Sequence, residues 1–123
     1  MTPQRNAVLT YLQSAKDFQS AQQIHSALAA TGTAVGLATV YRTLAALVSG
    51  AEIDELRTAD GETLYRHCGT SKHHHHLVCR KCGTAKEITG PSLENFLSGV
   101  AKNNNFTDLE HTIELWGTCS DCR

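Results

Sequence analysis

Two pairs of cysteines carry the clearest chemical signal in this chain. Cys79 and Cys82 are separated by two residues, and Cys119 and Cys122 repeat that spacing. Two intervening residues let a tight turn present both sulfurs to one ion, and two such turns complete a tetrahedron of thiolates. Zn²⁺ suits this set because it has no redox chemistry and no d-electron preference for geometry. The spacing predicts a closed structural zinc site, with a redox pair or a disulfide as the alternative.

A fifth cysteine, Cys68, shortly precedes the run His73-His74-His75-His76. Thiolate and neutral imidazole are both good zinc ligands. On an extended backbone successive side chains point to opposite faces, so alternate histidines share a side. Four consecutive histidines therefore suggest two separate metal sites that take two histidines each. The alternative is a solvated polyhistidine loop that binds metal loosely.

Both histidine pairs need further ligands. Cys68 is the obvious soft partner, and Asp54, Glu94 and His111 are candidates. Each of these three also has an ordinary interpretation, as a strand-edge acid, a surface helix acid and a strand histidine. The residues alone leave open which of them completes which pair.

Length and composition restrict the class of protein. With 123 residues, the chain suits one compact domain or two small domains whose thin cores need a metal or a partner subunit. It has no apolar run near the ~20 residues of a membrane span, and it opens MTPQRNAVL without a signal segment. We therefore expect a cytoplasmic protein without a membrane partner, in which thiols stay reduced and serve as metal ligands.

The charge balance is unusual for a nucleic-acid binder. The chain holds 11 Lys and Arg against 12 Asp and Glu, without the basic excess that such proteins commonly carry. Any affinity for DNA must come from local clustering of charge, helix dipoles and dimerisation.

The N-terminal half predicts three helices and a hairpin. Thr2-Pro3 is a typical helix start, and Ser20 with Gln23 matches a capping box. A third helix begins near Leu37 and ends at Ser49-Gly50. Its apolar positions fall on or beside one face: Leu37, Val40, Tyr41, Leu44, Leu47 and Val48. Strands at about 52–57 and 62–66 follow, joined by the turn Asp60-Gly61, which is the order of a winged helix-turn-helix.

The C-terminal half predicts a small α+β unit. After a loop at 69–72, we expect strands at Leu77-Val78 and 84–88 around the first cysteine pair. A helix follows Pro91, and a last strand covers about 109–117. The helix has apolar residues at i, i+3, i+4 and i+7: Leu93, Phe96, Leu97 and Val100.

The third helix has the properties of a DNA-recognition helix. Its non-core positions include small residues that would admit it to the major groove: Ala38, Thr39 and Thr43. Arg42 can chelate guanine O6 and N7, and Tyr41 or Thr39 can touch a thymine methyl. Tyr41 is also compatible with core packing. Arg5 is a candidate phosphate contact, and Arg57 is a weaker one.

Taken in order, TPQR, ATVYRTL, HHHHLVCRKCG and CSDC closely resemble the ferric uptake regulator (Fur) family, in particular its zinc uptake regulator (Zur) branch. These motifs are specific and span essentially the whole chain. The resemblance implies an α+β protein with a winged-helix domain, expected at 1–68 with a hinge from about 66, and a dimerisation domain at 73–123. It also implies a homodimeric, metal-dependent repressor that reads a palindromic double-stranded DNA operator and has no small-molecule substrate.

The resemblance also assigns ligand sets, with two to three Zn²⁺ per subunit, and marks Tyr41 and Arg42 as base-contacting. It gives the structural zinc to the four paired cysteines. It implies a regulatory hinge site of Asp54, Cys68, His74 and His76. A further site in the dimerisation domain would use His73, His75, Glu94 and His111.

One departure from the family pattern bears on the metal. Iron-sensing members commonly continue the histidine run with Asp-His, whereas Leu77-Val78 stand here. Losing these ligands while Cys68 is present favours zinc over iron or manganese, and nickel stays an alternative. We hypothesise that zinc at the hinge orients the two domains for operator binding.

Other functional classes fit the residues less well. A zinc enzyme would need an open metal position with a nearby acid-base group such as His-x-Glu, which the sequence lacks, so we expect no enzyme. A zinc-storage or metallochaperone module and a redox sensor built on Cys68 are the remaining alternatives.

Overall fold

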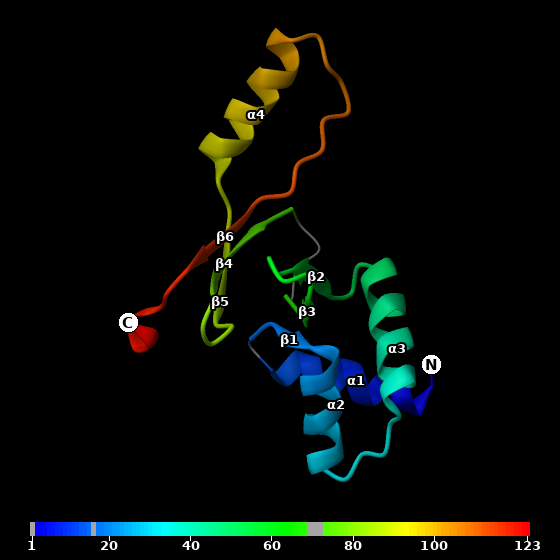
Figure 1. Ribbon diagram of the computed structural model, residues 1–123. Coiled ribbons are helices and arrows are strands. Elements are labelled where there is room, and N and C mark those ends of the chain that lie inside the picture. The colour runs from blue at the N-terminus through cyan, green and yellow to red at the C-terminus, as the bar shows by residue number, and fades with distance from the viewer. Residues whose placement is uncertain (1, 16, 69–72) are drawn as a thin grey trace. The chain divides into compact units, whose positions relative to one another are not determined.

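The computed structural model describes residues 2–15, 17–68 and 73–123, and the chain divides into two compact units, residues 1–71 and 72–123 (Figure 1). The fold is α+β, as the sequence predicted, with a winged helix-turn-helix followed by a smaller mixed unit. The loop predicted at 69–72 lies outside the described residues. Among the described residues, no helix has the length and apolar character that crossing a membrane requires.

The first unit is built on three helices: α1 (Pro3–Ser14), α2 (Ala21–Ala30) and α3 (Leu37–Ser49). Thr2 caps α1 by accepting a hydrogen bond from the Arg5 N–H, and Ser20 with Gln23 forms the predicted capping box of α2. The caps satisfy backbone donors that the first turn of a helix leaves unpaired. The helices enclose one core, whose central side chains are at most 3% exposed: Val8, Leu12, Ile24, Leu28, Val40, Leu44 and Leu47.

A three-stranded antiparallel sheet completes the first unit, in the order β1 (Gln19–Ser20), β3 (Thr63–Arg66), β2 (Asp54–Arg57). β2 and β3 form the predicted wing, and Gly61 in their turn has φ 85°, which glycine adopts without strain. β2 begins later than predicted because the Glu52 N–H bonds back to the Leu47 carbonyl at the end of α3. β1 was not predicted, since two residues are too few for an alternating pattern.

The second unit contains β4 (His75–Cys79), β5 (Ala85–Ile88), α4 (Pro91–Asn103), β6 (Glu114–Gly117) and a short 3₁₀ helix, η1 (Ser120–Cys122). Its sheet has the order β5-β4-β6, with β5 antiparallel and β6 parallel to β4. β4 extends back into the histidine run, beyond the predicted Leu77-Val78. β6 is shorter than the predicted 109–117, because its pairing with β4 begins where Glu114 lies opposite His76.

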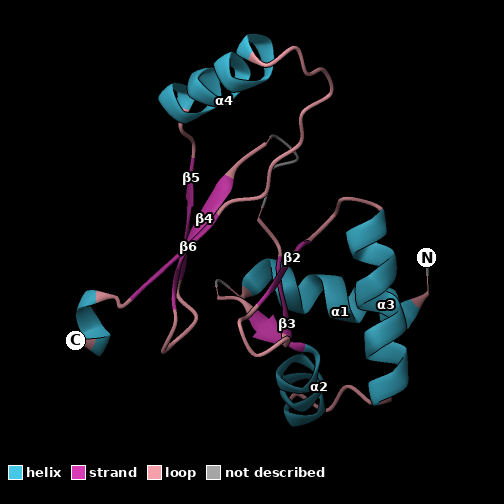
Figure 2. Ribbon diagram, turned by 45° about the horizontal axis from the view of Figure 1, so that its top comes forward, coloured by secondary structure: helices cyan, strands magenta, loops and turns pink. Residues whose placement is uncertain are grey.

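The second unit buries little apolar surface. Figures 1 and 2 both show α4 standing apart from the three strands, and no residue of α4 is buried. The predicted apolar face is present, but Phe96 is 65% exposed and Val100 is 39% exposed. The amphipathic pattern therefore does not produce a core within this unit.

Candidate metal centres and recognition helix

The four paired cysteines lie together at one end of the second sheet. Cys79 ends β4 and Cys82 lies in the turn that follows, while Cys119 caps the start of η1 and Cys122 is its last residue. The parallel pairing of β4 with β6 aligns Cys79 with Gly117, and this brings the second pair beside the first. All four sulfurs lie within 4.8 Å of one another.

The spacing of the sulfurs fits a zinc ion. Zn–S bonds of ~2.3 Å in a tetrahedron place the sulfurs ~3.8 Å apart. Cys82 Sγ and Cys119 Sγ are 3.7 Å apart, and the four paired cysteines are not joined by disulfide bonds. The geometry is that of ligands around one ion and not that of two disulfides, whose S–S bonds are ~2.05 Å.

Local hydrogen bonds favour the thiolate form of Cys79 and Cys82, the form that binds a cation. Backbone N–H groups of Cys119 and Lys81 each donate to Cys79 Sγ at 3.4 Å. Such donors, with that of Cys119 the strongest, lower the pKa of Cys79 to about 6. Bonding to the Thr84 hydroxyl lowers the pKa of Cys82. The pKa of Cys122 is raised to about 12, mainly because its protonated thiol is hydrogen-bonded to Cys119 and then to Cys82.

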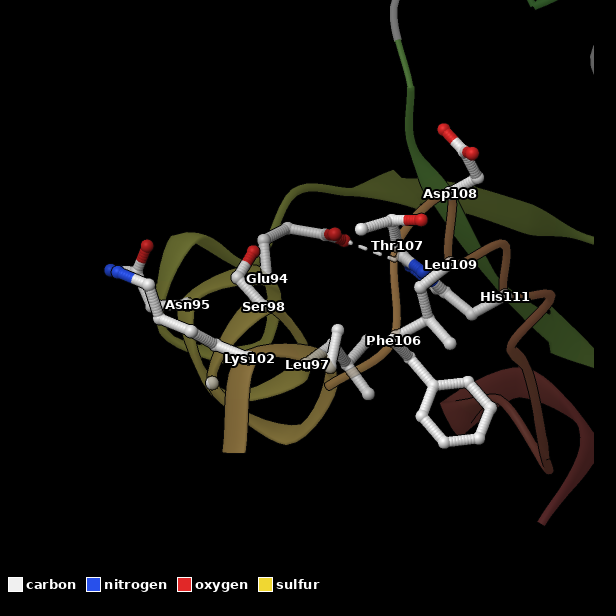
Figure 3. A pocket seen from close by; sticks show the side chains of 12 residues that line it. Glu94, Asn95, Leu97, Ser98, Lys102, Phe106, Thr107, Asp108, Leu109 and His111 are labelled. Atoms are coloured by element: carbon white, nitrogen blue, oxygen red, sulfur yellow. Dashed lines mark hydrogen bonds and ion pairs between the residues drawn. The ribbon is translucent and has the colours of Figure 1, made fainter. Parts of the chain in front are cut away.

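A second cluster joins alternate histidines to Glu94 and His111. His75 begins β4 and His73 lies two residues before it, while Glu94 comes from the first turn of α4 and His111 from the segment before β6. One oxygen, Glu94 Oε1, lies 3.1, 2.8 and 3.2 Å from the Nε2 atoms of His73, His75 and His111. Figure 3 shows the Glu94 side chain reaching towards His111.

This second cluster also has the chemistry of a metal site. His73 Nε2 and His111 Nε2 are 3.0 Å apart, and two neutral nitrogen lone pairs at that distance repel unless a proton or a cation lies between them. Zn–N bonds of ~2.0–2.1 Å in a tetrahedron separate ligands by ~3.3–3.4 Å, close to the observed spacing. Hydrogen bonding to His75, and then to His111, lowers the pKa of Glu94, which favours its anionic form.

The remaining predicted ligands form two pairs, one in each unit. In the first unit Asp54 begins β2 and Cys68 follows β3, and the Cys68 thiol is hydrogen-bonded to the Asp54 carboxylate. Arg66 Nη1 donates to Cys68 Sγ at 3.3 Å. Burial, followed by the Asp54 carboxylate, raises the pKa of Cys68, so the thiol keeps its proton until a cation replaces it.

The pair in the second unit consists of His74 and His76. Their Nε2 atoms are 3.1 Å apart, and their side chains are 8% and 6% exposed. His76 Nδ1 lies 3.1 Å from Glu114 Oε2, and His74 Nε2 lies 3.6 Å from Glu87 Oε1. Sequence reasoning missed both carboxylates. Only the strand register could have found them, since both Glu87 and Glu114 lie opposite His76.

The third helix of the first unit presents the side chains expected to face DNA. Tyr41 is 50% exposed and is not a core residue. Arg42 is exposed, and its Nη2 donates to Thr39 Oγ1 at 3.1 Å. The expectation that Thr43 is a non-core position was wrong. Thr43 is 9% exposed, because it lies one turn from Val40 on the buried face of α3.

Arg5, the predicted phosphate contact, has an internal partner. Its guanidinium forms an ion pair with Glu52, which follows α3. The pair is partly exposed, with side-chain exposures of 29% and 37%. The first unit therefore neutralises one of its few cations.

Known proteins match this chain over nearly its whole length. The sequence model of the ferric uptake regulator family matches residues 1–116. The zinc uptake regulation protein of Mycobacterium tuberculosis is 48% identical over 123 residues, which cover 99% of this chain and 93% of that protein.

Two crystal structures extend the comparison. That of FurB from M. tuberculosis, described as a zinc uptake regulator, is 48% identical and covers 98% of this chain and 92% of that chain, with a TM-score of 0.58. That of the Vibrio cholerae ferric uptake regulator is 29% identical and covers 97% and 91%, with a TM-score of 0.79.

Proposed function

This chain belongs to the ferric uptake regulator family, and we propose that it is a zinc-responsive DNA-binding repressor of zinc uptake and homeostasis genes. The observation that carries the proposal is the composition of the ligand sets. Four thiolates gather in one set, three imidazoles and a carboxylate in another, and a thiol, a carboxylate and two imidazoles remain. Sulfur and nitrogen donors of this kind suit zinc better than iron or manganese.

The three sets have different roles. The cysteine set has four ligands and no open position, so it supports the fold of the second unit. Asp54 and Cys68 in the first unit, with His74 and His76 in the second, form the regulatory set. His73, His75, Glu94 and His111 form a further site. The count is two to three Zn²⁺ per subunit.

The regulatory role follows from which unit supplies each ligand. One ion held by Asp54, Cys68, His74 and His76 would fix the orientation of the DNA-binding unit relative to the other. Converting a mostly incompetent ensemble into a competent one needs about 5.5 kcal/mol, and tetrahedral zinc binding supplies roughly 10–16 kcal/mol. Rearrangement of DNA-binding domains is reported for the V. cholerae relative, which supports such a motion in this family.

The DNA-binding domain is assigned to 1–68 and the metal-binding dimerisation domain to 73–123. Within the first, α3 enters the major groove. In this proposal Arg42 chelates guanine, Tyr41 or Thr39 contacts a thymine methyl, and Arg5 contacts a phosphate. Half of Tyr41 is exposed although the residue is aromatic, which supports a surface role.

A homodimer explains the bare apolar surface of the second unit. Six of the seven large hydrophobic residues that are exposed in the described chain belong to this unit: Leu77, Phe96, Val100, Phe106, Leu109 and Leu115. A cavity of about 650 Å³ lies between α4 and the following loop, where Leu97, Phe106 and Leu109 meet (Figure 3). Such exposure marks a protein interface, and a two-fold dimer would read a palindromic operator. We also propose that the protein acts in the cytoplasm and is not an enzyme.

A metal titration of DNA binding tests the proposed function. Duplexes that bind the protein are first selected from a random pool in the presence of zinc. Binding of the most enriched duplex is then measured by fluorescence anisotropy against buffered free Zn²⁺, Fe²⁺, Mn²⁺ and Ni²⁺. We expect Zn²⁺ to support DNA binding at a lower free metal concentration than the other three ions. We also expect the selected duplexes to share a palindromic consensus sequence. A storage module would enrich no duplex. Equal binding by the chelator-treated protein would overturn the proposal.

A further inference from the structure

Glu114 is the first residue of β6. Its carboxylate contacts His76, a histidine of the regulatory set, at the ring nitrogen that does not face His74. Glu114 Oε2 lies 3.1 Å from His76 Nδ1, while the other ring nitrogen, Nε2, faces His74 Nε2 at 3.1 Å. His76 is 4% exposed, and the Glu114 side chain is 22% exposed. One imidazole is thus held between a carboxylate on one side and a second imidazole on the other.

The strand register produces this contact. β6 runs parallel to β4, and Glu114 is the direct partner of His76. A contact between directly opposed residues on adjacent strands involves little chain freedom, because both backbones are held by the ladder. The strand pairing therefore holds the two residues next to each other.

We propose that Glu114 is a positioning residue that accepts the His76 Nδ1–H and so keeps the Nε2 lone pair available to a metal ion. This inference rests on the proposed function, in which His76 is a ligand of the regulatory zinc. A neutral imidazole carries one proton, and a carboxylate accepts but does not donate, so the proton is held at Nδ1. Metal-ligating histidines commonly use this arrangement, which sets the tautomer and the ring orientation.

Glu87, on the other flank of β4, is not equivalent to Glu114. Its Oε1 lies 3.6 Å from His74 Nε2, the nitrogen that faces His76 Nε2. Glu87 therefore approaches the ligand atoms themselves. The tautomer-setting contact belongs to Glu114.

The tautomer of His76 can be read without DNA. The full-length protein is stripped mildly so that the cysteine set retains its zinc, and ¹⁵N–¹H correlation spectra report which nitrogen of His76 is protonated. We expect an unprotonated Nε2 in the wild type and mixed tautomers in Glu114→Gln, whose amide can also donate to Nδ1. A protonated Nε2 in the wild type overturns the inference, even where the variant fails to fold.

Zinc affinity supplies the second measurement. In a His111→Ala background, which removes a ligand from the other histidine cluster, competition with a fluorescent chelator measures the regulatory set. Glu114→Gln should weaken zinc binding roughly 10- to 100-fold. Glu110→Gln removes the same charge at an exposed position and should leave the affinity unchanged. Equal affinities of Glu114→Gln and wild type would contradict the inference. Cys68→Ser in the same titration reports separately on the proposed function, because that variant leaves the His76 tautomer intact.

Discussion

The backbone N–H of Cys119 donates to Cys79 Sγ at 3.4 Å, so residues 40 positions apart in the chain share one hydrogen bond at the cysteine cluster. The bond exists because β4 and β6 are parallel neighbours whose ends carry the two cysteine pairs. It stabilises a thiolate at Cys79 before any ion is considered. The spacing within each cysteine pair and the pairing of β4 with β6 together form the cysteine cluster.

Acidification should release the zinc of the cysteine set. The pKa of Cys79 is about 6, below its ordinary value of 9.0, so the fold favours the thiolate. The resulting stabilisation is complete above the ordinary pKa and is lost as pH falls through about 6. Zinc competes with protons and delays the loss. We expect retention at pH 7 and release only below pH 6, followed with a chromophoric chelator and circular dichroism. Release between pH 8 and 7 would contradict this assignment.

Cys68→Ser should weaken zinc-dependent DNA binding and leave the fold intact. The change removes the soft ligand of the regulatory set, while the four paired cysteines are untouched. Anisotropy against free zinc should show a midpoint shifted to higher zinc, and the melting curve should stay near that of the wild type. Cys79→Ser is the matched control, since it should destabilise the second unit and dissociate the dimer. An unchanged zinc midpoint for Cys68→Ser would reject the regulatory role.

Phe96→Glu should produce monomers. Phe96 is 65% exposed on the apolar face of α4, where burial in a partner would contribute roughly 1.5–3 kcal/mol. A charge there would have to be desolvated in the interface, which is costly. Sedimentation velocity measures the assembly state. Asn95→Glu adds the same charge at the neighbouring exposed position and serves as the control; a dimeric Phe96→Glu would show that this face is not the interface.

Arg42→Ala should remove specific DNA recognition while retaining non-specific binding. A bidentate contact with guanine contributes about 1–3 kcal/mol to discrimination between bases. The selected duplex should therefore lose roughly 5- to 150-fold in affinity, with a smaller change for a scrambled duplex. Parallel titrations of the two duplexes measure the difference. Equal loss on both would assign Arg42 to the phosphate backbone instead.

Glu52→Gln should strengthen DNA binding at all sequences. The Glu52 carboxylate forms an ion pair with Arg5 in the free protein, so a phosphate must compete for the same guanidinium. Releasing Arg5 should steepen the slope of log K against log salt by up to about 0.9, the value for one added phosphate contact. Glu110→Gln controls for net charge. An identical slope for Glu52→Gln and wild type would show that Arg5 does not reach DNA.

The two cysteine pairs, both helix caps and the order of helices and strands could be predicted because each depends on neighbours a few residues away. A turn of two residues sets the distance between Cys79 and Cys82 wherever the turn lies. The capping box of Ser20 and Gln23 likewise closes within one turn of helix. The alternation of the histidines needs only an extended backbone.

Other features depended on which segments meet in space. The pairing of Glu114 with His76 follows from a parallel strand register that no local pattern encodes. The ion pair of Arg5 with Glu52 joins residues 47 positions apart. The apolar face of α4 was predictable as a pattern, whereas its exposure was not.

By itself, the sequence determined the ligand types, their local spacing and the family, because chemistry and short-range geometry are written in adjacent residues. The tertiary structure decided which carboxylates support the ligands and which apolar surface stays uncovered. Burial and long-range contacts depend on which other segments pack against a given segment, and this is set by the topology of the folded chain.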